Sequence, residues 1–285
     1  MAETRISFST LACPNCTVPQ IVDAAVEARY HGIELRFVEG EDSLWKLPAF
    51  QGAGLRDALN RISDAGLAIS CLDTSCRFDS PDVSERDRWI EEGLRMADLA
   101  AALRAPGIRV FGDRVPPGVE REMTGEWVHD SMSSLAERVA QFGVEVWLET
   151  HGDFSRAGDV LPALPQRNGV GLVWDAVSAF VECGERPLQH GTALQTLIRH
   201  VHIKDLRNEN GKWIPALIGE GVFPLAGIRA ALKAFNYTGF LSFEWEKKWH
   251  PEIEPPEVAI PHFANWFRER WQVLDETGIL SGAHD

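Results

Sequence analysis

Short apolar runs alternate along the chain with segments whose apolar residues recur at helical spacing. The apolar runs predict strands over residues 5–10, 32–37, 67–72, 108–111, 144–148, 170–174, 200–204 and 240–243. The segments after them predict helices over residues 18–28, 55–66, 83–103, 127–142, 159–164, 191–199, 225–235 and 258–274. Strands that alternate with helices through short connections favour a parallel sheet. Eight such units in 285 residues predict a single (β/α)8 TIM barrel of the α/β class, with its active site at the carboxyl ends of the strands.

No stretch of the chain indicates a second domain, so we expect residues 1–285 to form one barrel domain. There is no linker rich in Pro, Gly or Ser and no low-complexity segment. The first residues lack the apolar core of a signal peptide, and no apolar run approaches the ~18 residues that cross a bilayer. Five cysteines, an odd number, favour a reducing compartment. We therefore expect a cytoplasmic protein with no membrane partner.

The chain is strongly acidic. Its formal net charge is −14, from 28 basic and 42 acidic residues. A nucleic-acid partner favours a basic stripe that offsets phosphate charge, so this excess of acid argues against one. The charge is compatible with a small polar substrate or a divalent cation.

Four consecutive strands place a candidate metal ligand at or near their carboxyl ends. The fifth strand runs into Glu149, and the sixth runs into Asp175. The seventh strand carries His202, and the eighth runs into Glu244. Because barrel chemistry takes place where the strands end, we expect these side chains to surround one site. Three carboxylates and one imidazole suit one divalent ion, Mn²⁺, Mg²⁺, Co²⁺ or Zn²⁺, and leave coordination positions for substrate oxygens.

Seven short segments carry a resemblance to a known family. They are Gly32-Ile-Glu-Leu-Arg36, Leu148-Glu-Thr-His151, Val173-Trp-Asp175, Gly184-Glu-Arg-Pro187, His200-Val-His-Ile-Lys-Asp205, Gly219-Glu-Gly221 and Tyr237-Thr-Gly-Phe-Leu-Ser-Phe-Glu244. Because these segments occur in this order along the chain, the chain resembles the xylose isomerase-like TIM barrel superfamily. That superfamily contains sugar isomerases, sugar phosphate isomerases and epimerases, ketose 3-epimerases and inosose dehydratases. The ordered set implies the fold without specifying a substrate.

The resemblance also implies roles for individual residues. It makes Glu149, Asp175, His202 and Glu244 the metal ligands, and Glu149 and Glu244 the acid and base on opposite faces of the substrate. The ion would acidify the C–H next to a carbonyl, and the two glutamates would move the proton. The chain departs from the family pattern at Ser178, because many relatives place a His or Asn shortly after the aspartate. The implied partner is a small sugar or polyol-derived molecule. Barrels of this kind are often homo-oligomers, so by analogy the resemblance also allows a dimer or a tetramer.

Two further candidates for substrate contacts follow predicted ligands on the same strand face. His151 lies two residues after Glu149 and is placed to bind a substrate hydroxyl, or alternatively to cap the next helix. Glu246 lies two residues after Glu244 and is placed to contact substrate, or alternatively to pair with a neighbouring lysine. His200 shares the parity of His202 but lies deeper along the strand, so we interpret it as a core or supporting histidine.

Three basic residues at predicted strand ends are candidates for binding a hydroxyl, carboxylate or phosphate group. They are Lys204, Arg207 and Arg36. The alternative for each is an ion pair within the protein. For Lys204 and Arg207 this would be a surface pair with Asp205 or Glu209, and for Arg36 a pair in the barrel interior with Glu34 or Asp73.

The leading hypothesis is a metal-dependent isomerase or epimerase of a small sugar, sugar phosphate or keto-polyol. The alternative is a dehydratase of the inosose or dehydroshikimate type, because both reactions begin with proton abstraction next to a carbonyl. An apurinic endonuclease shares the fold but needs extra histidines, and the third and fourth strands end at Leu72-Asp-Thr and Phe111-Gly-Asp instead. A non-catalytic sugar-binding barrel would not need all four ligand positions.

Overall fold

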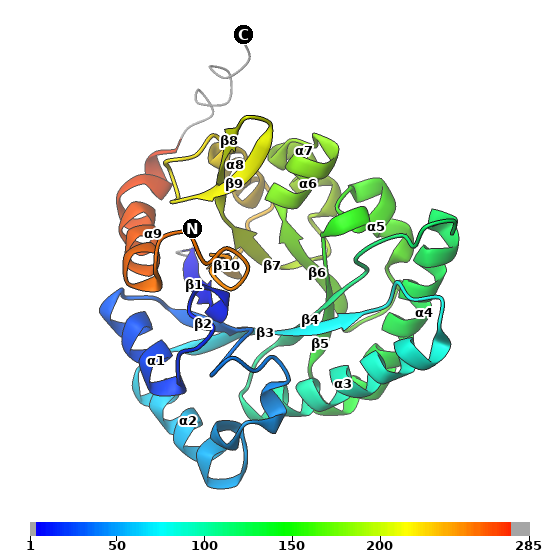
Figure 1. Cartoon of the computed structure of the whole chain (residues 1–285), viewed down its shortest axis with the longest axis horizontal. Helices are drawn as coiled ribbons and strands as arrows, with labels where there is room; N and C mark the ends of the chain where they lie inside the picture. Colours follow the sequence, from blue (N-terminus) through cyan, green and yellow to red (C-terminus); the bar gives the residue numbers. More distant parts are fainter. Residues whose placement is uncertain (1–3, 275–285) are drawn as a thin grey trace.

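Eight parallel strands close into a barrel in the computed structural model, which describes residues 4–274 (Figure 1). The ends of the predicted domain, residues 1–3 and 275–285, lie outside the described residues. The barrel strands are β1 (Arg5–Ser9), β2 (Gly32–Leu35), β3 (Ala68–Arg77), β4 (Gly107–Phe111), β5 (Glu145–Glu149), β6 (Val170–Asp175), β7 (Ile198–Ile203) and β10 (Phe240–Phe243). β1 pairs with β10, with Phe8 opposite Phe243, and this pairing closes the ring. The predicted fold class is confirmed.

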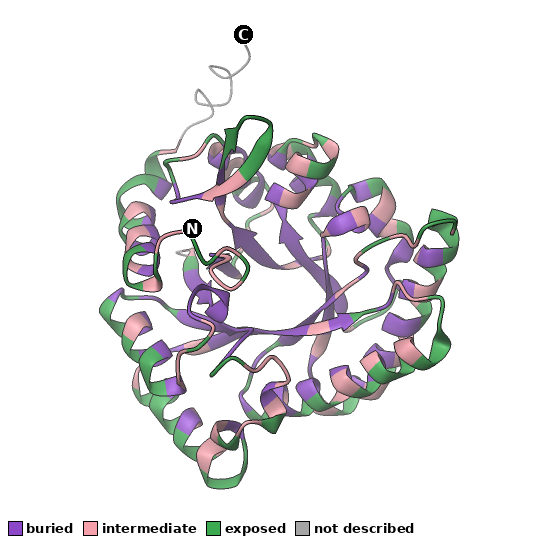
Figure 2. Cartoon of the chain, in the orientation of Figure 1, coloured by how far each residue is buried: buried purple, intermediate pink, exposed green. Residues whose placement is uncertain are grey.

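Helices surround the barrel and face solvent with their outer sides (Figure 2). They are α1 (Val18–Glu27), α2 (Gly52–Asp64), α3 (Val83–Ala102), α4 (Arg121–Val139), α5 (Ala157–Ala163), α6 (Ala176–Cys183), α7 (Pro187–Leu194), α8 (Leu225–Ala234) and α9 (Pro256–Arg270). Short 3-10 turns are η1 (Thr10–Ala12), η2 (Leu44–Lys46), η3 (Pro48–Phe50), η4 (Ala140–Phe142), η5 (Gly152–Phe154) and η6 (Trp271–Val273). No helix among residues 4–274 combines the length and apolar character needed to cross a bilayer.

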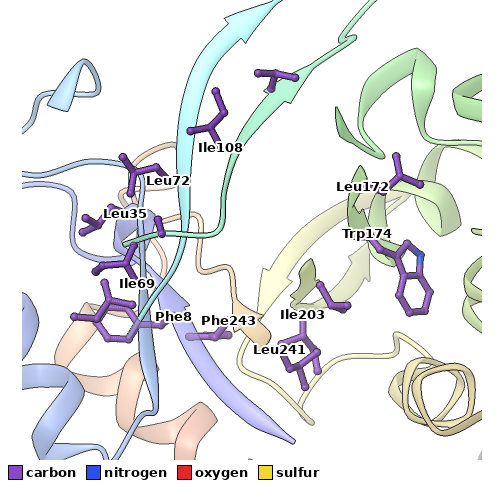
Figure 3. Packing of buried hydrophobic residues seen from close by; sticks show 14 of the residues in the cluster. Phe8, Leu35, Ile69, Leu72, Ile108, Leu172, Trp174, Ile203, Leu241 and Phe243 are labelled. Atoms are coloured by element: carbon purple, nitrogen blue, oxygen red, sulfur yellow. The ribbon is translucent and has the colours of Figure 1, made fainter. Parts of the chain in front are cut away.

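The main apolar core lies between the strands and the helices. Successive strand residues point to opposite faces of the sheet. Phe8 therefore packs against Tyr30, with ring centroids 5.0 Å apart, and Phe243 stacks on Phe263 of α9 at 4.8 Å. Figure 3 shows part of this cluster, including Phe8, Phe243 and Trp174. The intervening strand residues face the inside of the barrel, which leaves that space for other chemistry.

The inside of the barrel is largely polar. Below the strand ends, Trp147 forms a small apolar cluster with Cys71 and Val173, separate from the main core. Gly107 makes room for the indole, because a Cβ there would lie 2.4 Å from Cε2 of Trp147. Around this cluster the buried interior carries serines, acids, histidines and an arginine rather than the branched aliphatic residues typical of such barrels.

Helix α6 begins directly at the end of β6 and was not predicted. Asp175 is both the last residue of the strand and the N-cap of the helix. Its Oδ1 accepts hydrogen bonds from the N–H groups of Val177 and Ser178, at 2.9 and 3.1 Å. Gly184, with a φ of 68°, ends the helix in the left-handed conformation. No break separates strand from helix in the sequence, so the apolar pattern alone does not mark the boundary.

An antiparallel hairpin follows β7 and was also not predicted. It joins β8 (Asp205–Glu209) to β9 (Lys212–Ala216), and it projects from the barrel end near α8 (Figure 1). Asn210 and Gly211 form its turn, with φ values of 53° and 83°. Both positive values are what a tight two-residue hairpin turn requires.

Asp205 organises the segment that returns from this hairpin. Its Oδ1 accepts hydrogen bonds from the N–H groups of Leu206 and Phe223, and its Oδ2 accepts from Gly219 and Gly221. The Gly219-Glu-Gly221 segment therefore directs its amides at a carboxylate of the same chain. This segment forms a turn whose amides are occupied by Asp205.

Gly221→Ala is expected to lower the free energy of unfolding by ~1–3 kcal/mol, because the added carbon overpacks a closed site. A Cβ at Gly221 would lie 2.1 Å from Asp205 Oδ1 and 2.4 Å from the backbone oxygen of Leu206. Urea denaturation measures the loss. Gly125→Ala is the control, because a Cβ there meets no atom within 4 Å. An equally small effect of both substitutions would show that the Asp205 turn adapts freely.

Candidate active site

The four predicted metal ligands lie at the carboxyl ends of adjacent strands. Glu149 ends β5, Asp175 ends β6, His202 lies near the end of β7, and Glu244 directly follows β10. Asp175 lies opposite His202 in the register of β6 and β7. All four side chains are buried.

Three of these side chains converge on a common point. Nδ1 of His202 lies 3.1 Å from Oε1 of Glu149 and 3.5 Å from Oε2 of Glu244. One donor atom from each residue lies within 4.8 Å of the other two. This arrangement of two carboxylates and an imidazole is of a size that one ion can bridge.

Acidic side chains dominate the electrostatics around His202. Burial opposes charging of His202, but Glu244, Glu34 and Glu149 outweigh it and raise the pKa of the imidazole well above its usual value. The two glutamates differ from each other. Burial opposes ionisation of Glu149, yet Arg109 and His202 hold its pKa far below the usual range. For Glu244 burial prevails over Lys204 and His202, and its pKa is raised.

Asp175 is not part of this three-residue group, and its carboxylate faces Lys204. Oδ2 of Asp175 is 3.0 Å from the Lys204 ammonium, which also lies 2.7 Å from Glu244 Oε2 and 2.7 Å from Glu246 Oε1. Lys204 therefore pairs with neither of its sequence neighbours Asp205 and Glu209. The role of Asp175 as the fourth ligand stays a prediction.

His151 and Glu246 lie beside the cluster. His151 Nδ1 is 3.3 Å from Asp113 Oδ1, and its ring packs on Phe111 with centroids 5.1 Å apart. His151 is the N-cap residue of η5, but its side chain makes no capping hydrogen bond, so the alternative of a side-chain cap is wrong. Glu246 joins Lys204 to His250, which is 3.5 Å away, and its pKa is lowered to about 2 as these two cations overcome burial. Both remain candidates for contacting substrate.

Arg207 and Arg36 do not contact the cluster. Arg207 lies in the hairpin and is half exposed, with its Nε donating to Glu209 Oε1 at 2.7 Å. Arg36 is buried and donates from Nη2 to Ser75 Oγ at 2.7 Å, while its Nη1 lies 3.7 Å from Asp42. Arg36 thus forms an internal pair, but with Asp42 rather than Glu34 or Asp73.

Arg109, on β4, is a site residue that the sequence interpretation missed. Its Nε lies 3.2 Å from Glu149 Oε2, and its Nη2 lies 3.2 Å from Asp73 Oδ2. The guanidinium also lies 4.0 Å over the ring of Phe111. All three charged side chains are almost completely buried. The available signal was an arginine at an inward-facing position of an otherwise apolar strand, Gly-Ile-Arg-Val-Phe.

Asp73 and Glu34 extend this buried polar layer. Burial is the largest influence on Asp73 and raises its pKa to about 7, despite the opposing charge of Arg109. Glu34, on β2, is hydrogen-bonded to Nε2 of His200. Both acids lie inside the barrel, below the ends of their strands.

The residues fit a divalent metal ion. Two carboxylates and one imidazole are a donor set that Mn²⁺, Co²⁺ and Zn²⁺ accept. Glu149 Oε2 and Asp175 Oδ2 are buried and have no hydrogen-bond partner within residues 4–274. Each of these oxygens faces a cationic group, Arg109 Nε at 3.2 Å and Lys204 Nζ at 3.0 Å, so each lies where the protein accommodates positive charge.

A model of the family described as xylose isomerase-like TIM barrel matches residues 22–270. The chain belongs to this family. No curated protein matches it significantly. The match covers β2 to α9, and so includes every strand that supplies a residue of the cluster.

Several solved structures are similar to this chain over most of its length. The probable 3-DHS dehydratase AsbF from Bacillus anthracis is 19% identical, with a TM-score of 0.77 over 94% of this chain and 100% of its own. The 3-keto-D-glucoside 4-epimerase YcjR from E. coli is 17% identical, with a TM-score of 0.74 over 93% and 99%. The IOLI protein, solved with a bound zinc atom, is 16% identical, with a TM-score of 0.75 over 92% and 97%. At these identities the similarity shows the fold alone.

Proposed function

We propose that this family member is a divalent-metal-dependent isomerase or epimerase of a small keto-sugar or polyol-derived ketone. The observation that carries the proposal is the convergence of Glu149 and Glu244 on Nδ1 of His202 at the strand ends. Barrel enzymes perform their chemistry at this face. The epimerase and zinc-bound neighbours support the same class by fold analogy.

When bound, a divalent ion supplies Lewis-acid polarisation of the substrate carbonyl. The chain's own residues then move the proton on the adjacent carbon. Glu244 suits the role of the group that takes the proton, because burial raises its pKa and one face of its carboxylate is oriented by Lys204. Glu149, whose Oε2 is held by Arg109, is ionised before the reaction and anchors the site. Return of the proton by Glu244 to the neighbouring carbon gives an isomer. For an epimer, Glu149 takes a second proton from solvent and delivers it to the opposite face of the same carbon, while Glu244 releases its proton to solvent.

We further propose that the substrate is unphosphorylated, because the basic groups at the carboxyl ends of the strands are already paired. The three basic residues that are candidates for binding a phosphate all have acidic partners in the protein. Lys204 is surrounded by three carboxylates, and Arg207 pairs with Glu209. The amides of Gly219 and Gly221 bind Asp205. Hydroxyl groups, which are neutral, do not have to displace these pairs.

A dehydratase is the second candidate, and the fold similarity to the probable dehydratase AsbF favours it. Both reactions begin with proton transfer next to a carbonyl. Proton NMR in D₂O, with metal-loaded protein and a panel of keto-sugars and inososes, separates the two. Solvent deuterium in an isomer or epimer supports the proposal, and a dehydrated enone supports the dehydratase. Unchanged substrates without deuterium throughout the panel would contradict both.

Removal of the metal is expected to abolish proton exchange. Without an ion, the C–H next to an unpolarised carbonyl is too weak an acid for a carboxylate base. Initial rates of deuterium uptake before and after dialysis against a chelator measure the effect. Activity should return on addition of Mn²⁺, Mg²⁺, Co²⁺ or Zn²⁺. Full activity of the chelator-treated protein, at confirmed zero metal content, would rule out the metal-dependent mechanism.

A further inference from the structure

Glu34 is a fully buried carboxylate that depends on two imidazoles. Its Oε2 accepts a hydrogen bond from His200 Nε2 and lies 3.2 Å from His202 Nε2. Within residues 4–274 these two histidines are its ion-pair partners. Burying a carboxylate costs free energy unless it is paired, so an acid at this position needs both contacts.

His202 presents its two ring nitrogens to opposite sides of the barrel interior. Nδ1 faces Glu149 and Glu244 at the mouth, at 3.1 and 3.5 Å. Nε2 faces Glu34 at 3.2 Å and is buried. This second contact is at ion-pair distance, and Nε2 has no other partner among the described residues. The two faces therefore meet different groups, one of them at the proposed metal position.

We propose that Glu34 is a positioning residue that orients His202 for metal binding. It would hold the Nε2–H of the imidazole, so that Nδ1, which is directed at the two glutamates, is the nitrogen that exchanges its proton for the ion. A carboxylate that accepts from the distal N–H of a metal-bound histidine fixes its tautomer and strengthens it as a ligand. The inference rests on the proposed function, because it assumes a metal at Nδ1.

His200 holds Glu34 in place from below. Its ring stacks on Trp147, with centroids 6.0 Å apart and planes 17° apart, and it meets the edge of His202 at 5.7 Å. The indole is itself enclosed by Cys71 and Val173. This packing restrains the His200 ring, and through it the carboxylate of Glu34. His200 thus acts on His202 through Glu34.

A separate metal ion bound by Glu34, His200 and His202 is the competing interpretation, since their donor atoms also lie within 4.8 Å of one another. It is disfavoured because the His202 imidazole would then have to bind two ions, one through each nitrogen, which requires loss of both its N–H protons. The metal-to-protein ratio distinguishes one ion from two.

Titration of the metal-free full chain with Co²⁺ tests the inference in four proteins: wild type, Glu34→Ala, Glu34→Gln and Ser70→Ala. Calorimetry gives the Kd and the ratio, and the visible spectrum of Co²⁺ reports the ligand geometry. Glu34→Ala should raise the Kd ~10–100-fold. Glu34→Gln should raise it less, because its amide oxygen still accepts from Nε2–H. Among the side-chain hydrogen bonds of the described residues, the Ser70 hydroxyl takes part only in the one to Ser7 Oγ, so Ser70→Ala should leave the Kd unchanged.

The outcomes separate the inference from the proposed function. Wild-type Kd and spectrum in both Glu34 variants would overturn the inference alone. Two ions in wild type and one in Glu34→Ala would assign Glu34 its own ion and overturn it as well. A wild-type protein without Co²⁺ affinity would overturn the proposed function together with the inference. If Glu34→Ala does not fold in a urea-denaturation control, Glu34→Gln decides, and it must raise the Kd more than Ser70→Ala does.

Discussion

Glu244→Gln is expected to lower kcat by ~10²–10⁴-fold, the contribution typical of a positioned general acid or base. The amide has the shape of the carboxylate and keeps one oxygen for the metal, but it does not accept a proton at neutral pH. The rate of deuterium uptake into substrate, measured at saturating metal, gives the effect. Saturating metal ensures that a weaker ligand is not mistaken for a missing base.

Glu252→Gln is the matched control for this prediction. Glu252 lies in the same loop after β10, is exposed at the surface and contacts His250 rather than the cluster. We expect its substitution to change kcat less than about twofold, as for surface positions without a special role. If Glu244→Gln retained nearly wild-type kcat at full metal occupancy, the base would have to be sought elsewhere.

Arg109→Met is expected to lower the free energy of unfolding by ~3–5 kcal/mol, because it leaves buried carboxylates without their cation. Arg109 is 2% exposed and lies between Asp73 and Glu149, at 3.2 Å from each. Methionine preserves much of the side-chain volume, so the loss reports mainly on charge. Urea denaturation of the metal-free protein measures it.

Arg199→Met provides the comparison, because Arg199 forms the same kind of contact at the surface. Its Nε lies 3.2 Å from Glu145 Oε2, but its side chain is 36% exposed. Exposed pairs contribute ~0–1 kcal/mol, so only a small loss is expected. Adding Asp73→Asn to Arg109→Met should recover part of the stability, since it removes one unpaired charge. Equal losses for the two arginine variants would contradict the role of Arg109 as a buried counter-ion.

The barrel could be predicted from sequence because its strands and helices are local patterns. β10 begins and ends where the apolar run predicts, and the other barrel strands overlap their predicted ranges. Helix α6 was missed because Asp175 ends the strand and caps the helix at once. The hairpin was missed although Asn210-Gly211, a typical hairpin turn, marks it. A single domain over residues 1–285 stays a prediction.

The site was predictable only as far as strand ends determine it. The convergence of Glu149, His202 and Glu244 follows from parallel strands that end at one face. The contact of Glu34 on β2 with His200 on β7 crosses the barrel interior, and strand order alone does not specify which residues meet there. The partners of Lys204 could not be predicted from sequence either, because its long side chain extends to Asp175 rather than to the acidic residues that follow it in the chain.

Whether Glu149 and His202 hold a metal ion is tested by measuring the metal content of three proteins. Wild type, Glu149→Ala and His202→Ala are purified, loaded with Mn²⁺, Co²⁺ or Zn²⁺, desalted and analysed by elemental mass spectrometry, with circular dichroism to confirm folding. We expect one ion per wild-type chain and almost none in either folded variant, since a catalytic site built on few ligands does not tolerate the loss of one. Equal metal content in all three proteins, or a wild-type chain that retains none, would contradict a metal centre at these residues.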